Sequence, residues 1–287
     1  MLIQKRVKNY KGVVNMVDIL IDEYIEKSTY EYIIKKLNND GALHFSLIDP
    51  DPLRQGPNKA AKMAKYAEEA GTDAILIGGS TVFDQTFVDK TILAIKEKVN
   101  VPLILFPGGV SNISQYADAI LFMSLLNSSD PFFIIGQQAL ASYTIKAAGL
   151  ESISMAYLIV EPGASAGWIG NAKLLPRNKP KLTTAYALAA EMYGFKIIYL
   201  EAGSGSERIP KEHIEMCSKI INIPIIVGGG VSCKDDAKCF VEAGADIIVM
   251  GTFLENNLLK DNGTSLQEII EEIKDAGKTQ KKNYPIK

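Results

Sequence analysis

Residues 199–206, YLEAGSGS, join an apolar run to a glycine-rich turn. Tyr199 supplies a hydroxyl, Glu201 a carboxylate, and the turn at 203–205 a backbone with little side-chain bulk. A carboxylate can anchor or deprotonate a hydroxyl group, and exposed backbone N–H groups in such turns bind anions. We therefore expect this stretch to bind a ligand with both hydroxyl and anionic groups, as in a phosphorylated polyol.

Two further glycine-rich turns follow apolar runs later in the chain. Gly229 and Gly230 end the run at 224–230, and Gly251 and Thr252 follow the run at 246–250. A tight turn would be enough to explain one such glycine pair. Three turns that all follow apolar runs favour a phosphate site built from neighbouring loops.

Oxygen ligands stand at two other run ends. The first run continues into LIDPDP with Asp49, and the second ends in two glycines and Ser80. A carboxylate and a hydroxyl with no cysteine or histidine beside them suit Mg²⁺ better than zinc. We expect Asp49 to act in the site, whereas Asp51 is better explained as a turn residue before proline.

Other reactive side chains give weaker signals. His44 and His213 have no serine or cysteine nucleophile pattern around them, which argues against hydrolase chemistry, and His213 falls in a predicted surface helix. The three cysteines lack metal-ligand spacing and are expected to be structural thiols. The chain has neither a dinucleotide-binding fingerprint nor a P-loop.

These residues need elements that bring them together. From residue 41 onward, apolar runs alternate with amphipathic segments, and their unbroken hydrophobicity is typical of strands buried on both faces of a parallel sheet. The runs are ALHFSLI (42–48), DAILIGG (73–79), PLILF (102–106), DAILFMS (118–124), SMAYLIV (154–160), KIIYL (196–200), PIIVGGG (224–230) and DIIVMG (246–251). Eight strand–helix units predict a (β/α)8 TIM barrel, whose active site forms where the strands end. A doubly wound open sheet would need fewer strands.

Two parts of the chain depart from a regular barrel. Residues 108–117 are too few for a full helix with both its loops, so the third helix should be replaced by a helical turn or irregular segment. Residues 1–40 form a predicted N-terminal helical extension, with a helix at 18–37 packed against the barrel bottom. Residues 41–287 form the predicted catalytic domain.

Composition limits the class of protein. The 287 residues carry a net charge of -2 without a basic block, which argues against nucleic-acid binding. No apolar window reaches bilayer length and the first residues do not form a secretory signal, so we expect a soluble cytoplasmic protein. Peripheral membrane contact stays open.

Several of these stretches together resemble one family. HFSLIDPDP, EAGTDAILIGGS, LFMSLLNSSDPFFIIGQQ, YLIVEPGASAGWIG, YLEAGSGS, VGGGV and DIIVMGT are similar to the geranylgeranylglyceryl phosphate synthases and their heptaprenyl relatives, over residues 41–256. AYLIVEPG with YLEAGSG is typical of the larger of the family's two groups. The resemblance implies a TIM barrel modified at the third helix, as the short third unit also predicts.

The resemblance implies a reaction and its site. Members join sn-glycerol 1-phosphate to a polyprenyl diphosphate with Mg²⁺, release diphosphate and form homo-oligomers (dimers or hexamers). Asp49 and Ser80 would hold the metal, and Glu201 and Tyr199 would act in catalysis. Glycerol phosphate would be bound by Tyr199, Leu200, Glu201, Ala202, Gly203, Ser204, Gly205, Gly229, Gly230, Gly251 and Thr252.

The chain departs from the family at Pro52, where relatives commonly have a basic residue, so Arg54 or a lysine of the 173–181 loop would have to bind the diphosphate. Phe106 and residues 122–126 could line a prenyl trough or simply pack in the core. Two other functions stay open: a phosphosugar isomerase or aldolase, and a non-catalytic phosphoglycerol-binding protein. No lysine stands at a strand end for a Schiff base, and Asp49 with Glu201 is the only plausible acid–base pair.

Overall fold

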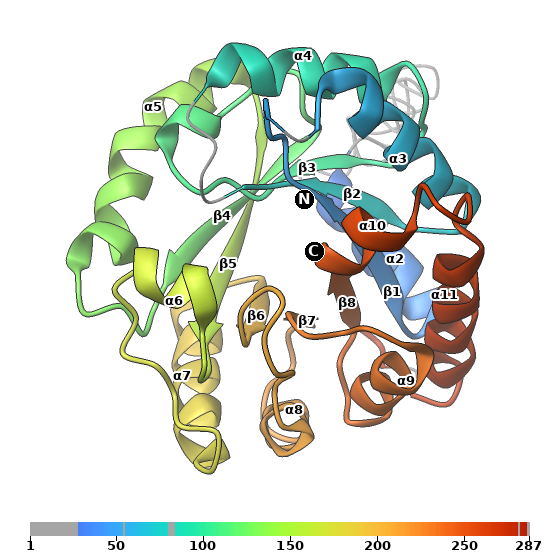
Figure 1. Ribbon diagram of the computed structural model, residues 1–287. Coiled ribbons are helices and arrows are strands. Elements are labelled where there is room, and N and C mark those ends of the chain that lie inside the picture. The colour runs from blue at the N-terminus through green and yellow to red at the C-terminus, as the bar shows by residue number, and fades with distance from the viewer. Residues whose placement is uncertain (1–27, 54, 80–83, 281, 286–287) are drawn as a thin grey trace, which may run out of the picture.

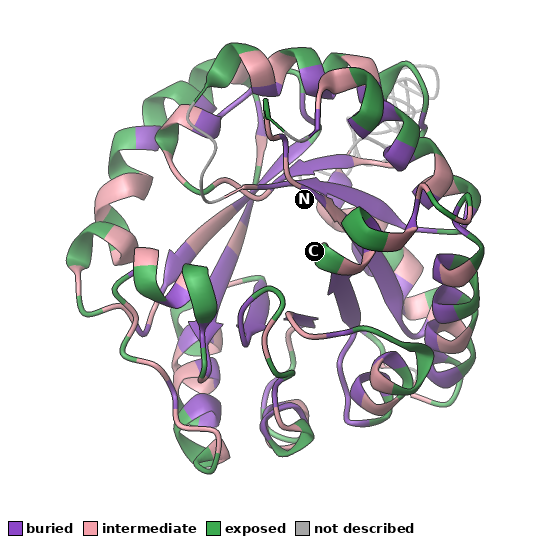
Figure 2. Cartoon of the chain, in the orientation of Figure 1, coloured by how far each residue is buried: buried purple, intermediate pink, exposed green. Residues whose placement is uncertain are grey.

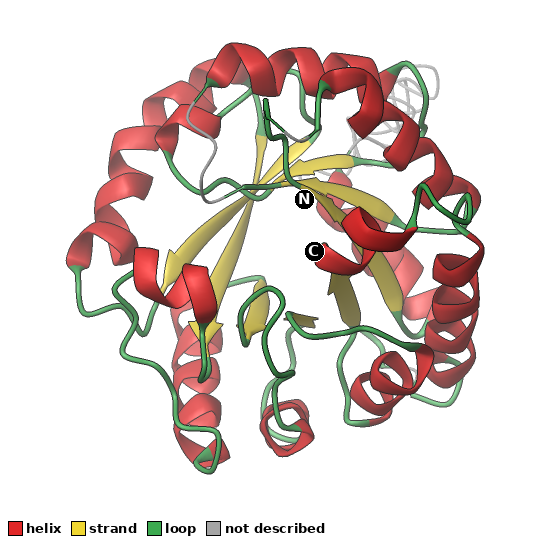
Figure 3. Cartoon of the chain, viewed as in Figure 1, coloured by secondary structure: helices red, strands yellow, loops and turns green. Residues whose placement is uncertain are grey.

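The computed structural model describes residues 28–53, 55–79, 84–280 and 282–285. Parallel strands follow one another around a closed barrel, and β8 pairs with β1, as Figures 1 and 3 show. The strands are β1 (Leu43–Ile48), β2 (Ala74–Ile77), β3 (Leu103–Leu105), β4 (Ala119–Leu125), β5 (Glu151–Ile159), β6 (Ile197–Glu201), β7 (Ile225–Gly228) and β8 (Ile247–Met250). The predicted (β/α)8 barrel is confirmed.

Helices surround the barrel and alternate with the strands. The longer ones are α3 (Pro57–Glu69), α4 (Gln85–Lys96), α5 (Gln137–Ala148), α7 (Pro180–Tyr193), α8 (Lys211–Ser218), α9 (Lys234–Glu242) and α11 (Thr264–Gly277). Two short helices, α6 (Ala164–Ile169) and α10 (Thr252–Asn257), lie over the open end of the barrel in Figure 1. Both belong to the loops that follow strands, so they help to form the upper face.

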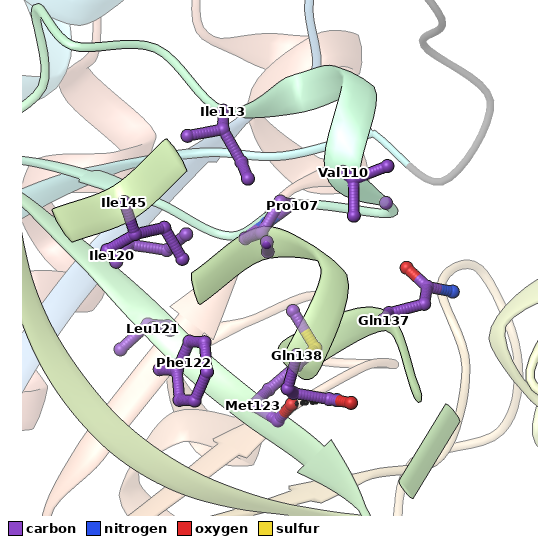
Figure 4. A pocket seen from close by; sticks show the side chains of 12 residues that line it. Pro107, Val110, Ile113, Ile120, Leu121, Phe122, Met123, Gln137, Gln138 and Ile145 are labelled. Carbon is purple, nitrogen blue, oxygen red and sulfur yellow. Dashed lines mark hydrogen bonds between the residues drawn. The ribbon is translucent and has the colours of Figure 1, made fainter. Parts of the chain in front are cut away.

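The third unit lacks a full helix, as predicted. Only a 3-10 turn, η2 (Val110–Asn112), lies between β3 and β4, and a π-helical turn, η3 (Phe132–Gly136), leads into α5. A small apolar cleft of about 50 Å³ lies between η2, β4 and α5. Figure 4 shows Val110 and Ile113 on one side of it and Ile145 on the other. Gln138 lies at its edge and donates a hydrogen bond to the Met123 carbonyl oxygen at 2.5 Å.

Strand side chains are buried on both faces, which explains the unbroken apolar runs. Phe45, Met155 and Ile197 belong to a cluster inside the barrel. Ile75 and Leu200, for example, belong to a second cluster between the strands and the helices. Figure 2 accordingly shows the strands as almost continuously buried.

An N-terminal helix, α2 (Thr29–Asp40), closes the lower end of the barrel. Its Ile33, Ile34 and Leu37 belong to the same apolar cluster as the barrel interior. Glu151 at the start of β5 accepts hydrogen bonds from the Ser28 hydroxyl at 2.8 Å and the Thr29 N–H at 2.6 Å. The predicted helix at 18–37 is thus confirmed from residue 29 on, and its earlier part lies outside the described residues. The predicted boundary at residue 40 falls between α2 and β1.

Aspartates at the starts of three strands join neighbouring strands at the lower end. Asp73 accepts the N–H of His44 at 2.9 Å, Asp118 that of Leu103 at 2.8 Å, and Asp246 that of Ile225 at 2.8 Å. Each aspartate lies directly before one strand, and its carboxylate accepts a backbone N–H at the start of the preceding strand in the sequence. These side chains therefore satisfy backbone donors where the sheet ladder begins.

The helices within the described ranges do not include one that is both long and apolar enough to cross a membrane.

Candidate active site

Two adjoining cavities open at the carboxyl ends of the strands. The aromatic cavity, about 370 Å³, is lined by Leu47, Asp49, Gly79, Phe106, Pro107, Gly108, Met123, Leu125, Phe133, Gln137, Gln138, Tyr157, Ser165, Ala166, Ile169, Gly170, Glu201, Ser204, Gly251, Thr252 and Glu255. The loop cavity, about 500 Å³, is lined by Leu47, Tyr199, Glu201, Ser204, Gly205, Ser206, Gly229, Gly230, Val231, Ser232, Val249, Met250, Gly251, Thr252, Phe253, Asn256 and Asn257. Residues shared by both cavities, Glu201 among them, lie at their junction.

Aromatic side chains hold Glu201 in place. Tyr157 and Tyr199 are neighbours in β5 and β6, and both hydroxyls hydrogen-bond to the Glu201 carboxylate. Their rings meet edge to face with centroids 5.2 Å apart, and Phe106 stacks on Tyr199 at 5.2 Å. Such packing fixes the ring orientations and so aims two hydroxyl donors at one carboxylate.

The pKa of Glu201 is raised to about 7, mainly because the carboxylate is buried. Hydrogen bonds from the Gly203 N–H and the two tyrosine hydroxyls lower the pKa and partly offset this effect. A carboxyl group with a pKa near neutrality can accept a proton and release it again at physiological pH. Burial, together with the charge of Glu201, in turn raises the pKa of both tyrosines well above 10. The tyrosines therefore act as hydrogen-bond donors, and Glu201 is the group that can exchange a proton.

The glycines at the end of β7 and directly after it make room for these side chains. A β-carbon at Gly228 would overlap the Tyr199 hydroxyl, and one at Gly229 would overlap the Glu201 carboxylate. Gly229 also has a backbone φ of +84°, a value that residues other than glycine rarely adopt. The sequence predicts an anion site at this turn, and the structure gives its glycines a second role: the absence of side chains leaves space for Glu201 and Tyr199.

The stretch at 199–205 divides between two faces of β6. Tyr199 and Glu201 point into the barrel, whereas Leu200 and Ala202 pack outward against the helices. Only the backbone of Leu200 and Ala202 can therefore take part in substrate binding. Gly203 donates its N–H to the Glu201 carboxylate at 2.6 Å, so this donor is already engaged. The predicted phosphate-binding residues Ser204, Gly205, Gly229, Gly230, Gly251 and Thr252 all line the loop cavity.

Asp49 faces the aromatic cavity. Its Oδ1 is buried without a hydrogen-bond partner among the described residues, and burial followed by the nearby Glu255 charge raises its pKa to about 6. A β-carbon at Gly78 would come within 2.7 Å of this oxygen, so glycine is needed there. Ser80, the second predicted metal ligand, lies outside the described residues.

This donor set is compatible with Mg²⁺. Asp49, Glu201 and Glu255 line the aromatic cavity, and no lysine, arginine or histidine within the described ranges lines either cavity. A divalent cation beside Asp49 would use its unpartnered oxygen. The described residues do not include three acidic, histidine or cysteine side chains grouped closely enough to hold a metal by themselves. Mg²⁺ is commonly held by one or two carboxylates together with substrate phosphates, so a substrate diphosphate would have to complete the coordination.

A lysine of the 173–181 loop was expected to bind the diphosphate, but none of these lysines lines either cavity. Lys173, Lys179 and Lys181 are exposed. The Arg177 guanidinium donates to the backbone carbonyl oxygens of Glu161 and Arg208. Arg54, the other residue expected to bind the diphosphate, lies outside the described residues.

Only part of the predicted prenyl trough faces the aromatic cavity. Phe106, Met123 and Leu125 line this cavity, and Met123 also borders the small cleft, whereas Phe122 lines only the small cleft. The wall is completed by Phe133, Ile169 and other residues that sequence reasoning missed. They follow strands in long loops whose course the apolar pattern does not predict.

Tyr157 is the main residue that sequence reasoning missed. A signal was present, because YLIVEPG (157–163) and YLEAGSG (199–205) each begin with a Tyr-Leu pair near the ends of consecutive strands, and Tyr157 lies opposite Tyr199 in the sheet. Adjacent parallel strands bring such matching positions side by side.

Residues 33–276 match the PcrB family. The chain belongs to the PcrB family. The geranylgeranylglyceryl phosphate synthase of Thermococcus sibiricus is 49% identical over 247 residues, which cover 85% of this chain and 96% of the relative. That of Methanosphaera stadtmanae is 53% identical over 214 residues, covering 74% of this chain and 87% of the relative.

Solved structures agree with this membership. The crystal structure of (S)-3-O-geranylgeranylglyceryl phosphate synthase from Thermoplasma acidophilum, in complex with sn-glycerol-1-phosphate, matches with a TM-score of 0.81 at 42% identity and covers 86% of this chain and 98% of that chain. The resemblance of the sequence motifs to the geranylgeranylglyceryl phosphate synthases is therefore confirmed.

Proposed function

We infer that this PcrB-family protein joins sn-glycerol 1-phosphate to a polyprenyl diphosphate, forms the first ether bond of an ether-linked phospholipid and releases diphosphate. The single observation that carries this function is the position of Glu201, buried at the junction of a glycine-rich cavity and an aromatic one. A small phosphorylated alcohol fits the first cavity and an apolar chain the second, so their reactive ends would meet at Glu201. The similar proteins that bear this activity in their names support the same function.

The glycerol phosphate is placed in the loop cavity. Backbone and hydroxyl groups of Ser204, Gly230 and Thr252 would surround its phosphate, while its free primary hydroxyl lies toward Glu201. The hydroxyl proton passes to the Glu201 carboxylate as the oxygen forms a bond to the first prenyl carbon. The bond from that carbon to the diphosphate breaks, and the electron pair leaves with the diphosphate.

The prenyl diphosphate is placed in the aromatic cavity, with geranylgeranyl diphosphate as the expected donor. Phe106, Met123 and Phe133 would contact the hydrocarbon, and the enclosed wall would keep water from the allylic cation. Asp49 and Ser80 would hold Mg²⁺, which would stabilise the charge on the leaving diphosphate. Asp49, Glu201 and Glu255 line the cavity that would receive the anionic diphosphate, and this supports a metal requirement.

The observations favour this reaction over a phosphosugar aldolase and over a non-catalytic binding protein. A phosphosugar aldolase would need a lysine for a Schiff base, and none of the described cavity residues is a lysine. A phosphoglycerol-binding protein would have no use for a carboxyl with a pKa near neutrality beside a second, aromatic cavity.

The decisive experiment incubates the purified chain with labelled sn-glycerol 1-phosphate, geranylgeranyl diphosphate and Mg²⁺. We expect labelled ether lipid and released diphosphate, and neither product with Glu201→Gln. If the folded protein forms no ether product with prenyl diphosphates of several lengths, the inferred function is wrong. Product formation that is unchanged in EDTA would remove the metal from the proposal.

We also propose that the protein is a homo-oligomer, a dimer or hexamer. Large apolar side chains are unusually exposed on three neighbouring elements: Tyr143 of α5 at 87%, Trp168 of α6 at 86% and Tyr193 of α7 at 83%. Contact between copies would remove such surface from water. Sedimentation equilibrium should give a multiple of 31.3 kDa, and a monomer at micromolar concentration would contradict this assembly.

A further inference from the structure

The loop that follows β6 has little packing of its own. Ser204 and Gly205 line the loop cavity but are exposed, as are Glu207 and Arg208. Ser206 bonds only to the start of the loop, through the carbonyl oxygens of residues 202 and 203 at 2.8 and 2.6 Å. The outer half of the loop at 204–208 therefore depends on contacts from other segments.

Arg177, in the long loop after β5, supplies such contacts. Its Nη2 donates to the Arg208 carbonyl oxygen at 2.9 Å and lies 2.9 Å from a Glu207 carboxylate oxygen. Its Nη1 donates to the Glu161 carbonyl oxygen at 3.1 Å. One guanidinium group thus joins the loops that follow β5 and β6, a geometry for which its fixed fork of donors is suited.

The backbone of Arg177 is itself held from two sides. Its N–H donates to the Glu161 carboxylate at 3.2 Å, and its carbonyl oxygen lies 2.8 Å from Nε2 of His213 in α8. A carbonyl only accepts, so Nε2 carries the proton and Nδ1 accepts from the Thr183 hydroxyl at 2.8 Å. His213 was predicted to lie on a surface helix, but it is fully buried, and burial lowers its pKa, which keeps it neutral.

The position of Arg208 affects the opposite wall of the loop cavity. Its backbone packs so closely on Gly230 that a β-carbon there would come within 2.6 Å of the Arg208 nitrogen. Its side chain pairs with Asp236, which also accepts hydrogen bonds from the N–H of Ser232 at 3.3 Å and its hydroxyl at 3.1 Å. Gly230 and Ser232 both line the loop cavity.

We propose that Arg177 is a positioning residue that holds the loop at 204–208 in the conformation that binds the phosphorylated alcohol, without touching the substrate. The proposal rests on the inferred function, which places that substrate in the loop cavity. Arg177 lines neither cavity, so it acts through the Arg208 carbonyl and the Gly230 contact. The long loop after β5 thus supports a neighbouring loop, whereas the sequence comparison with the family suggested that one of its lysines binds the diphosphate.

The test compares steady-state kinetics of Arg177→Ala, Arg177→Lys and the matched control Lys181→Ala, which also removes one positive charge but at an exposed residue that lines neither cavity. Loss of two hydrogen bonds from a charged group should raise the KM for sn-glycerol 1-phosphate by about tenfold or more in Arg177→Ala. The KM for the prenyl diphosphate and kcat should stay within about twofold, because the aromatic cavity and Glu201 are untouched. The KM for glycerol phosphate of Arg177→Lys should lie between those of the wild type and Arg177→Ala, since one ammonium reaches fewer of the acceptors. Lys181→Ala should resemble the wild type.

The outcomes separate this proposal from the inferred function. An inactive wild type would overturn the function itself. An active wild type with an unchanged KM for glycerol phosphate in Arg177→Ala would overturn the positioning role alone, as would an equal loss in both KM values and kcat. If Arg177→Ala does not fold, Arg177→Lys decides, because its KM for glycerol phosphate must still rise selectively.

Discussion

Replacing Gly229 with alanine should remove activity by displacing Glu201. The new β-carbon would occupy the position of a Glu201 carboxylate oxygen and would lie 3.0 Å from the Gly203 nitrogen that donates to it. The carboxylate would have to rotate away from its tyrosine and backbone donors. Loss of a positioned general base lowers turnover by about 10²- to 10⁴-fold, so we expect ether-lipid formation to fall by at least about 100-fold.

The same substitution also strains the backbone, and this effect needs a control. Gly229 has a φ of +84° and Gly194, at the end of α7, has a φ of +86° with nothing within 4 Å of an added β-carbon. Both alanine variants should lose about 1–2 kcal/mol of unfolding free energy from the left-handed conformation. Only Gly229→Ala should lose turnover.

The assay follows labelled glycerol phosphate into ether lipid, alongside urea unfolding of both variants. Full activity in Gly229→Ala would show that the Glu201 orientation is not required. Equal, small losses of turnover in Gly229→Ala and Gly194→Ala would attribute the effect to backbone strain. Either result would refute the role assigned to this glycine.

Three further predictions concern titration, metal and stability. Glu201, with a pKa of about 7 against an ordinary 4.5, should make turnover rise as pH increases through 7. Because the pKa of Glu201 is raised in the folded state, its ionisation lowers the free energy of unfolding as pH rises from 4.5 to 7. At pH 8, the urea concentration at the midpoint of unfolding should therefore be higher for Glu201→Gln than for the wild type. Near pH 4.5 the two midpoints should be similar. Asp49→Asn should require a higher Mg²⁺ concentration for half-maximal turnover, while Asp51→Asn should not. The wild type should also require a higher Mg²⁺ concentration below pH 6, because a protonated Asp49 cannot bind the metal. An Asp49→Asn Mg²⁺ titration that matches the wild type would exclude Asp49 as a ligand. Asp246→Ala leaves the buried Ile225 N–H without its partner and should cost about 1–3 kcal/mol of unfolding free energy, more than Asp118→Ala, whose side chain is 38% exposed; equal losses would contradict this explanation.

The sequence predicts the barrel well because each strand is buried on both faces. Unbroken apolar runs such as 196–200 then differ clearly from the amphipathic helices between them, and the short interval at 108–117 shows the missing third helix directly. The position of the glycine-rich turns around the loop cavity is also predictable, since these turns follow strands and strand ends meet at one face.

Other features depend on contacts between distant segments. His213 has the surroundings of a surface residue in sequence, but it is buried in the structure, where its ring nitrogens pair with the Arg177 carbonyl oxygen and the Thr183 hydroxyl. Gly203 has the appearance of a free donor, but the turn directs its N–H back to Glu201. Such pairings are decided by loop conformation, which the hydrophobic pattern does not contain.

The lower end of the barrel joins the earliest and latest parts of the described chain. Asn38 and Tyr284 exchange hydrogen bonds with each other across 246 residues, as donor and acceptor in turn. During synthesis, α2 would leave the ribosome long before Glu151 and Tyr284 have been made. The full set of hydrogen bonds that hold the N-terminal region of the described chain in place can therefore form only after the last part of that chain has been synthesised.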